Sequence, residues 1–267
     1  GEASGQEIVN TIFCELDALG FNAGSPLGVA VSGRLDDAGH WHAVNTSTLS
    51  GVAGFPLGAE ISSRGGQATR CSNDAIAAAY AEAAFGAGMH FRRFGYLTVS
   101  TGVGGAIVID GHPMTSPNGL AGHVGFVSSR HSDVRCGSGR VGTVESRASG
   151  RALAAAAARL GHHGLDGRAI FAAAETEAWA LSLIEDSAGA IATLTADLVA
   201  MLGLDVMAIG GSIGLAPGYL EHVKLALQNE PDLFHIPVVP AHLGHDGPLL
   251  GALGLAQEDG LDHAAHD

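Results

Sequence analysis

The order of apolar segments in this sequence predicts an α/β protein, in which strands alternate with helices along the chain. Apolar runs of strand length recur between longer segments in which apolar residues follow helical spacing. The 267 residues include 40 glycines, and these gather at the ends of apolar runs, where tight turns between strand and helix need them. The length allows one large domain or two smaller ones, each with its own core.

The first third of the chain is expected to alternate helix and strand twice. In order, the expected elements are a helix over 5–19, a strand over 27–31, a helical start over 56–60 and a strand over 67–71. The first helix is predicted because apolar residues recur at helical spacing and Gly20 follows them. Asn73 and Asp74 are expected at the carboxyl end of the last strand, before an alanine-rich helix over 75–85.

The remaining elements continue the alternation. They are strands over 96–100 and 106–109, helices over 145–160 and 175–202, a strand over 205–209, a helix over 218–228, a strand over 236–239 and a closing helix over 248–257. The first two strands are expected to form a hairpin around the glycine-rich segment Thr101–Gly105. Asp110 and Gly111 are a second hairpin signal.

Charge and composition argue against a nucleic acid, a membrane or a histidine-bound metal ion as a partner of this chain. The formal net charge of −14 argues against a nucleic-acid partner, because phosphate backbones attract basic surfaces. Three widely spaced cysteines give no disulfide framework and indicate a reducing, cytoplasmic setting. No apolar run is long enough to span a bilayer, so no membrane partner is expected. The 14 histidines follow no common ligand spacing and predict no metal site.

Asp74 is the first candidate for catalysis, because it follows a predicted strand and precedes a predicted helix. Ligands of α/β proteins bind at the carboxyl ends of strands, where an aspartate can serve as a general base. Asn73, beside it, offers a donor and an acceptor for a sugar hydroxyl. The alternative is that Asp74 only caps the helix, a role that aspartate favours.

Two glycine-rich segments are candidates for binding phosphate or nucleotide. The first contains Thr101, Gly102, Gly104 and Gly105, and the second contains Gly210, Gly211 and Ser212. Both follow apolar strands, and their missing side chains let backbone N–H groups approach an anion. The alternative is an ordinary turn in each case, and the first segment matches neither a Walker loop nor a Rossmann fingerprint.

Taken together, these segments resemble the ROK family of sugar kinases and repressors. The resemblance is carried by SNDAIAAAYAEAAFGAG, LTVSTGVGGAIVIDG, NGLAGHVGF, VESRASGRALAAAA, AIGGSIGLAPGYLEHV and FHIPVVPAHLGHDGPLLGALGLAQ. It covers essentially the whole chain and implies an actin-like (ribonuclease H-like) sugar kinase fold of two domains. The smaller, N-terminal-type α/β domain would be incomplete and comprise residues 1–74 and 247–267, and the larger C-terminal α/β domain would comprise residues 75–246.

The same resemblance implies ATP-dependent phosphorylation of N-acetylmannosamine at its 6-hydroxyl, a step of amino-sugar catabolism. Asp74 would be the base that takes the hydroxyl proton. The residues that would contact the sugar are Asn73, His123, Glu145 and Asn45, and those near ATP would be Thr101, Gly102, Gly104, Gly105, Gly210, Gly211 and Ser212. His123 stands where many sugar kinases of the family carry a glutamate. Mg²⁺ would arrive with ATP, and a homodimer is implied.

Two departures from the family pattern lead to further expectations. At the family's zinc-ligand positions, a histidine and three cysteines, this chain has Phe126, Cys136, Ser138 and Thr143. One thiolate cannot form a closed tetrahedral site, so no zinc is predicted and the loop over 128–142 is expected to be held by packing alone or to be mobile. The family's first strands carry an Asp-x-Gly-Gly-Thr phosphate motif, which is absent from this sequence. We therefore expect missing N-terminal strands, in a truncated or a poorly active protein.

The sequence leaves two other functions open. One is a ROK-type sugar-sensing regulator, although no helix-turn-helix segment is found and the chain is acidic. The other is a catalytically impaired protein that only binds sugar, which the absent phosphate motif and zinc ligands favour. Asp74 and the two glycine-rich segments favour the kinase.

Overall fold

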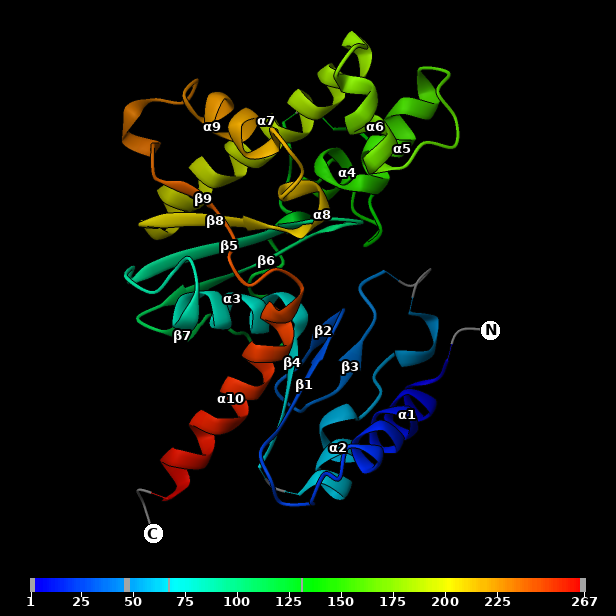
Figure 1. The fold of residues 1–267 in the computed structure, drawn as a ribbon, viewed down its shortest axis with the longest axis vertical. Coiled ribbons are helices and arrows are strands. Elements are labelled where there is room, and N and C mark those ends of the chain that lie inside the picture. The colour runs from blue at the N-terminus through cyan, green and yellow to red at the C-terminus, as the bar shows by residue number, and fades with distance from the viewer. Residues whose placement is uncertain (1–2, 46–48, 67, 131, 265–267) are drawn as a thin grey trace.

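Two sheets of different size organise the chain, and they lie one above the other in Figure 1. The computed structural model describes residues 3–45, 49–66, 68–130 and 132–264. The smaller sheet pairs β1 (Leu27–Val31) in parallel with β4 (Thr69–Asn73). The larger sheet has the strand order β7-β6-β5-β8-β9. Its strands are β5 (Arg93–Val99), β6 (Val103–Ile109), β7 (His112–Pro113), β8 (Val206–Gly210) and β9 (Val238–Pro240).

The smaller sheet, with the helices around it, forms the part of the molecule that we call the lower part. Its helices are α1 (Gly5–Ala18) and α2 (Leu57–Gly65). A capping box starts α1: Ser4 Oγ accepts from the Glu7 N–H, and the Glu7 carboxylate accepts from the Ser4 N–H. Alternate residues of β1 are buried against these helices. A short hairpin of β2 (Arg34–Leu35) and β3 (Trp41–His42) follows β1.

The five-stranded sheet is covered by helices on both faces and forms the upper part. The helices above it in Figure 1 are α4 (Glu145–Ala148), α5 (Gly150–Arg159), α6 (Gly167–Ala174), α7 (Ala178–Leu202), α8 (Gly211–Gly214) and α9 (Tyr219–Leu227). The opposite face packs on α3 (Asp74–Phe85). Strand β5 serves both cores: Phe94 and Tyr96 pack toward α3, whereas Leu97 and Val99 belong to the core under α7. This alternation is the two-residue period of a strand that is buried on both faces.

The last helix, α10 (Gly247–Ala264), runs from the upper part down along the lower part (Figure 1). It packs on α3 and on β1. The contact with α3 is close: a Cβ added at Gly251 would lie 1.8 Å from the carbonyl oxygen of Ala77. The chain entering α10 is fixed by Glu82 of α3, whose side chain is buried. Its carboxylate accepts hydrogen bonds from the N–H groups of Leu243 (2.7 Å) and Ala87 (2.9 Å).

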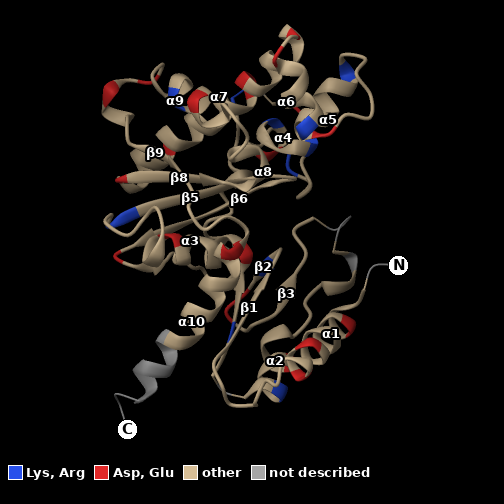
Figure 2. Cartoon of the chain, in the orientation of Figure 1, with Lys and Arg blue, Asp and Glu red and all other residues tan. Residues whose placement is uncertain are grey.

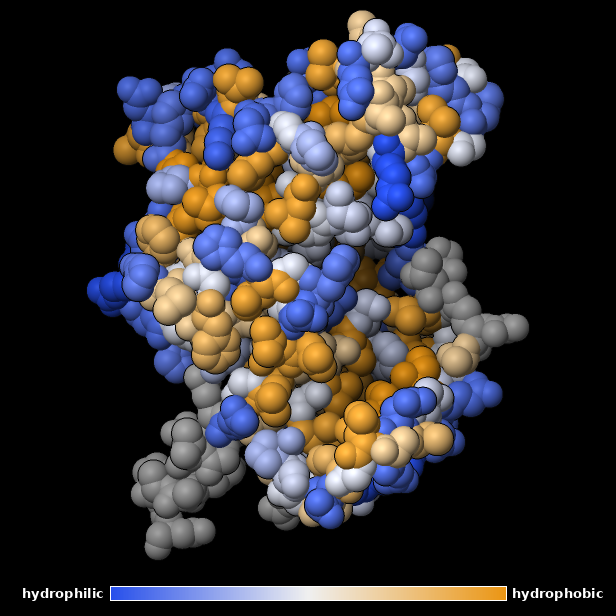
Figure 3. Space-filling view, in the orientation of Figure 1, coloured by the Kyte–Doolittle hydropathy of each residue, from blue (hydrophilic) through white to orange (hydrophobic). Residues whose placement is uncertain are grey.

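Four 3₁₀ helices complete the described elements: η1 (Ser50–Val52), η2 (Val124–Phe126), η3 (Asp232–Phe234) and η4 (Gly244–Asp246). Figure 2 shows acidic residues, in red, spread over both parts. Figure 3 shows apolar side chains on the face of the lower part beside α10, a helix that carries the exposed Leu249, Leu250 and Leu253. Among the helices that the structure describes, none has the length and apolar character needed to cross a membrane.

The α/β class predicted from the sequence is confirmed, and several boundaries differ. The predicted helix over 145–160 is two helices, because Ser149 ends α4 and its hydroxyl caps α5 by accepting from the Ala152 N–H. Helix α6 and the β2–β3 hairpin were not predicted, since each is too short to show a period. The strand expected over 67–71 lies two residues later, and Gln67 is outside the described residues. The division into domains at residues 74 and 247 stays a prediction.

Candidate active site

Three cavities meet where β5 ends, and of these the His123 pocket is also lined by residues of the lower part, such as Gly33 and Asn45. We name each after one lining residue. The His123 pocket has a volume of about 490 Å³, the Phe171 pocket about 740 Å³ and the His245 pocket about 300 Å³. Ser100 lines all three of them. A molecule in the Phe171 pocket and a second one in the His123 pocket would therefore approach each other at Ser100.

The His123 pocket brings together most of the residues predicted from the sequence. They are Asn45, Asn73, Asp74, Thr101, Gly102, Gly104, Gly105, His123 and Glu145. Gly211 and Ser212 line the adjoining His245 pocket, together with Asp74. Gly210 lines none of the three cavities; it is buried at the end of β8, where an added Cβ would lie 3.0 Å from the Tyr96 hydroxyl.

The junction of β4 and α3 holds Asp74 in a defined orientation. Asn73, the last residue of β4, is the N-cap of α3, so the capping role considered for Asp74 belongs to its neighbour. Oδ1 of Asp74 accepts hydrogen bonds from the Ala75 N–H (2.8 Å) and from Asn73 Nδ2 (3.0 Å). No other residue in the described part of the chain donates to Oδ2. One carboxylate oxygen is thus fixed by the protein, and the other is left to accept a proton.

The side-chain amide of Asn73 is already used within the protein. Nδ2 also donates to the Gly33 carbonyl (2.7 Å), and Oδ1 accepts from the N–H groups of Ala75 (2.9 Å) and Ile76 (3.1 Å). These bonds tie the end of β4 to the turn after β1 and to the first turn of α3. In this structure Asn73 positions Asp74, and its predicted contact with a sugar hydroxyl stays a prediction.

Burial shifts the pKa values of Asp74 and His123, two of the titratable groups that line this pocket. Burial raises the pKa of Asp74 above its ordinary value, against hydrogen bonds from Ala75 and Asn73 and the attraction of His123 when its ring is protonated, which lower it. Burial also lowers the pKa of His123, so its ring is neutral at pH 7. A carboxylate with a raised pKa is a stronger base than an exposed aspartate, which suits proton removal from an alcohol.

His123 presents a hydrogen-bonding atom that the described protein leaves unused. Its Nδ1 is buried and has no hydrogen-bond partner among the described residues. The ring stacks on Phe126, with centroids 5.9 Å apart and an interplanar angle of 21°. A buried polar atom without a partner is unfavourable unless a ligand or water supplies one. The stacked ring therefore offers a pre-oriented contact to a polar group of a bound molecule.

Glu145 joins the His123 pocket to the turn between β5 and β6. Its carboxylate is buried and accepts from the Val103 N–H through Oε2 and from the Gly137 N–H through Oε1, both at 3.3 Å. A Cβ at Gly102 would lie 2.7 Å from Oε2, so this turn needs glycine to let the carboxylate approach. Glu145 is thus fixed by two main-chain donors, one at the start of β6 and one in the loop over 128–142.

The predicted phosphate turn is shorter than the sequence analysis gave. Gly104 and Gly105 lie within β6, opposite Thr98 and Leu97, and only Ser100, Thr101 and Gly102 form the turn. Gly105 is required by packing, because a Cβ there would lie 2.7 Å from the Tyr96 carbonyl. Within the described chain, the N–H groups of Thr101 and Gly102 donate to no acceptor. These two N–H groups are free to meet an anion.

The second glycine-rich segment approaches the same place from β8. Gly211 has a φ of +86°, and a Cβ there would lie 2.3 Å from the Val99 carbonyl, so only glycine fits. Ser212 Oγ lies 3.0 Å from Ser100 Oγ. This hydroxyl pair joins the ends of β5 and β8 at the point where the three cavities meet.

The loop over 128–142 is held by hydrogen bonds, whereas packing alone or mobility was expected. The guanidinium of Arg140 donates to the Phe126 carbonyl (2.8 Å) and to Ser128 Oγ (3.3 Å). Cys136 Sγ lies 3.0 Å from Ser138 Oγ. The described residues contain no group of three or more histidine, cysteine, aspartate or glutamate side chains arranged for a metal ion. The expected lack of zinc stays a prediction.

Sequence reasoning missed several residues that line these cavities. Thr98, near the end of β5, and Ser100, in the turn that follows, both line the pockets, and their apolar neighbours in sequence hid them. Arg151 and Arg168 line the Phe171 pocket. They lie far from the glycine-rich motifs in sequence, and no local pattern marks them.

Comparison with known proteins gives a consistent result. The profile of the ROK family matches residues 6–259. The N-acetylmannosamine kinase of Salmonella typhi is 43% identical over 225 residues, which cover 82% of this chain and 75% of that protein. Among solved structures, the ROK hexokinase of Thermus thermophilus has a TM-score of 0.85 at 28% identity, covering 97% of this chain and 87% of that one. A ROK glucokinase of Streptomyces griseus in complex with glucose and AMPPNP has a TM-score of 0.75 at 25% identity, covering 96% and 89%.

Proposed function

The chain belongs to the ROK family, and from this premise we propose that it transfers the γ-phosphoryl group of ATP to the 6-hydroxyl of N-acetylmannosamine. Sugar kinase activity is supported by relatives at 43% identity and by the ROK hexokinase and glucokinase folds. The acceptor sugar, the position phosphorylated and a role in amino-sugar catabolism are parts of the proposal.

One observation carries the assignment of the acceptor side. Asp74 Oδ2 and the buried, unpartnered Nδ1 of His123 belong to one cavity of about 490 Å³, which has room for an N-acetylated hexose. A base must lie within hydrogen-bond reach of the hydroxyl that it deprotonates. Nδ1 of a neutral imidazole can donate to or accept from a sugar hydroxyl or acetamido group, depending on its tautomer. We assign His123 and Glu145 to the sugar ring and Asp74 to the hydroxyl that reacts.

The proposed reaction gives a separate role to Asp74, to Asn73 and to the N–H groups of the turn. The sugar hydroxyl oxygen attacks the γ-phosphorus while its proton passes to Oδ2 of Asp74, and the bond between the γ-phosphorus and the bridging oxygen breaks to release ADP. The N–H groups of Thr101 and Gly102 would hold phosphate oxygens, a positioning and electrostatic role that phosphoryl transfer requires. Asn73 would keep the Asp74 carboxylate oriented throughout.

The nucleotide would lie in the Phe171 pocket with its phosphates directed toward Ser100 and Ser212. At about 740 Å³ this cavity is the largest of the three that Ser100 lines, and its wall combines apolar and polar residues. Mg²⁺ would be held mainly by the phosphates that bring it, with one or two carboxylates at most from the protein. The candidate carboxylates are Asp74, which lines both smaller pockets, and Asp166, which lines the Phe171 pocket.

The proposal is tested by ADP release with N-acetylmannosamine, N-acetylglucosamine and glucose as acceptors, with the product identified by ³¹P NMR. We expect the highest kcat/KM for N-acetylmannosamine and a 6-phosphate product. A higher kcat/KM for glucose would contradict the assigned acceptor, and no turnover with any sugar would contradict the kinase.

His123 provides a sharper test of the acceptor pocket. His123→Ala is expected to raise the KM for the sugar about tenfold, because a hydrogen bond to the ligand is lost, while the KM for ATP changes little. His90→Ala removes an exposed histidine and is the matched control. An unchanged sugar KM in His123→Ala would remove His123 from the site. The homodimer implied by the family stays a prediction that sedimentation of the purified chain would test.

A further inference from the structure

The Phe171 pocket contains two arginines that the proposed reaction has not yet used. Arg151 comes from α5 and Arg168 from α6. They are the only arginine or lysine side chains among the described residues that line the three connected pockets. Neither guanidinium has a hydrogen bond or ion pair with another described residue. Asp166 lines the same pocket, but its Oδ1 accepts from the Ala169 N–H (2.8 Å), and it forms no ion pair with either arginine in the described chain. In a chain with a net charge of −14, two arginines without a carboxylate partner in one cavity favour an anionic ligand.

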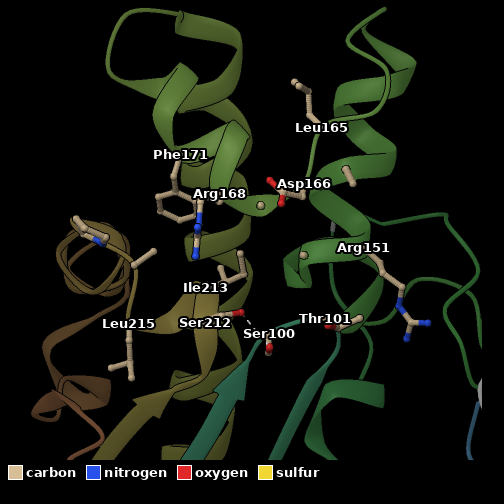
Figure 4. Close-up of a pocket in the computed structure, with 15 residues that line it drawn as sticks. Ser100, Thr101, Arg151, Leu165, Asp166, Arg168, Phe171, Ser212, Ile213 and Leu215 are labelled. Atoms are coloured by element: carbon tan, nitrogen blue, oxygen red, sulfur yellow. Dashed lines mark hydrogen bonds between the residues drawn. The ribbon is translucent and has the colours of Figure 1, made fainter. Parts of the chain in front are cut away.

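The two arginines lie at different ends of the pocket. Arg151 adjoins the turn between β5 and β6, since its own N–H points at the Thr101 carbonyl at 3.4 Å. In Figure 4 its side chain extends from α5 beside Thr101. Arg168 extends from α6 beside Phe171, toward the level of Ile213. Arg151 is therefore next to the unused N–H groups of the turn, and Arg168 is next to the apolar wall.

The backbone at the start of α5 cannot take the place of the Arg151 side chain. The Gly150 N–H donates to the Ser100 carbonyl (2.7 Å), and the Ala152 N–H donates to Ser149 Oγ (3.1 Å). With the Arg151 N–H directed at Thr101, the first N–H groups of this helix all have protein acceptors. An anion at this end of the pocket would meet the Arg151 guanidinium rather than a free helix N-terminus.

We propose that Arg151 binds the phosphate chain of the nucleotide, and that it supplies the positive charge which the turn at Ser100–Gly102 lacks. The inference rests on the proposed function, because it assigns the nucleotide to the Phe171 pocket. A guanidinium presents N–H groups in a planar fork that matches two phosphate oxygens. Arg168, beside the apolar wall, faces the nucleoside end of the same ligand.

The test compares the affinities of ATP, ADP and adenosine for the wild-type chain, Arg151→Gln, Arg151→Lys and Arg159→Gln by calorimetry. Arg159 is at the other end of the same helix, so its variant makes the same charge change away from the cavity. Arg151→Gln is expected to weaken ATP and ADP binding about tenfold, the usual effect of losing a charged hydrogen bond, and to leave adenosine within about twofold. Arg151→Lys should recover part of the loss, and Arg159→Gln should match the wild type.

Salt dependence separates a charge contact from a structural effect. ATP binding to the wild-type chain should weaken as salt rises, because ions screen an exposed charge pair, and this slope should be smaller in Arg151→Gln. Equal losses for ATP and adenosine, or no loss for ATP, would overturn the proposal for Arg151. If the wild type phosphorylates sugar while Arg151→Gln binds ATP normally, only the arginine assignment fails. A wild type that binds no ATP contradicts both the arginine assignment and the kinase.

Discussion

Replacing Asp74 with asparagine separates the chemical role of its carboxylate from its structural role. Oδ1 of the asparagine can still accept from the Ala75 N–H (2.8 Å) and from Asn73 Nδ2 (3.0 Å). Only Oδ2, which no other described residue uses, becomes an NH₂ group that cannot take a proton. We expect kcat to fall about 10²- to 10⁴-fold, the range of general base catalysis. This loss corresponds to about 3–5 kcal/mol of transition-state stabilisation.

The same substitution should not destabilise the fold at neutral pH. Because burial raises the folded-state pKa of Asp74, its protonated form favours the native state. That contribution is fully present below the ordinary aspartate pKa and is lost as the pH rises through the raised value. At neutral pH the wild type therefore carries a buried charge that Asp74→Asn lacks. The variant should have an equal or higher Tm at pH 7, and the difference should shrink toward acid pH.

The assay pairs initial rates of ADP release at saturating sugar and ATP with thermal unfolding of the same samples. Asp232→Asn, at a fully exposed site on η3, is the matched control and should keep the wild-type kcat. The wild-type kcat/KM should also fall on the acid side, as Asp74 becomes protonated below its raised pKa. An Asp74→Asn enzyme that kept more than about a tenth of the wild-type kcat would refute the assignment of the base.

Three further predictions concern stability and composition. Gly251→Ala should lower the free energy of unfolding by about 3 kcal/mol or more, because its Cβ would meet the Ala77 carbonyl at 1.8 Å. Gly189→Ala, within α7 and with no atom within 4 Å of the added Cβ, should raise the free energy of unfolding by about 0.5–1 kcal/mol. Denaturant unfolding that ranks the two variants in the opposite order would contradict the contact between α10 and α3. Tyr219→Phe removes a buried hydroxyl 2.8 Å from Ser187 Oγ and should lower the free energy of unfolding by about 1 kcal/mol. Ser187→Ala should lower it more, since it leaves both the Tyr219 hydroxyl and the Ala148 carbonyl without this partner. Equal losses for the two variants in a urea titration would argue against this network. Metal analysis of the purified chain should find no zinc, and a stoichiometric amount would show that the substituted ligand positions do not prevent binding.

The sequence was informative where a single local pattern determines the structure. The alanine-rich helix α3 ends at Phe85 as predicted, where a glycine follows, and begins one residue earlier than predicted, because Asn73 is its N-cap. The turn was misjudged at Gly104, since a glycine-rich segment does not reveal where strand pairing begins. Pairing with Thr98 across the hairpin decides the boundary, and the strand propensity of a glycine does not reveal that pairing.

The same distinction applies to the candidate site. Asp74 and His123 were found because their motifs are local in sequence, and the structure brings both to one cavity. Arg151 was not found, because it reaches its pocket only after α5 packs beside the β5–β6 turn. A surface arginine on an alanine-rich helix has no sequence signal of its own. Such residues become candidates only when burial, partners and charge are known.

Helix α3 connects the candidate active site to the last helix of the chain. Asp74 begins the helix, and Glu82, two turns later, holds the chain that leads into α10 through the Leu243 N–H. Helix α3 therefore links the candidate base at its N-terminus to the segment that leads into α10. The position of the start of α10 and the orientation of the Asp74 carboxylate thus depend on the same helix.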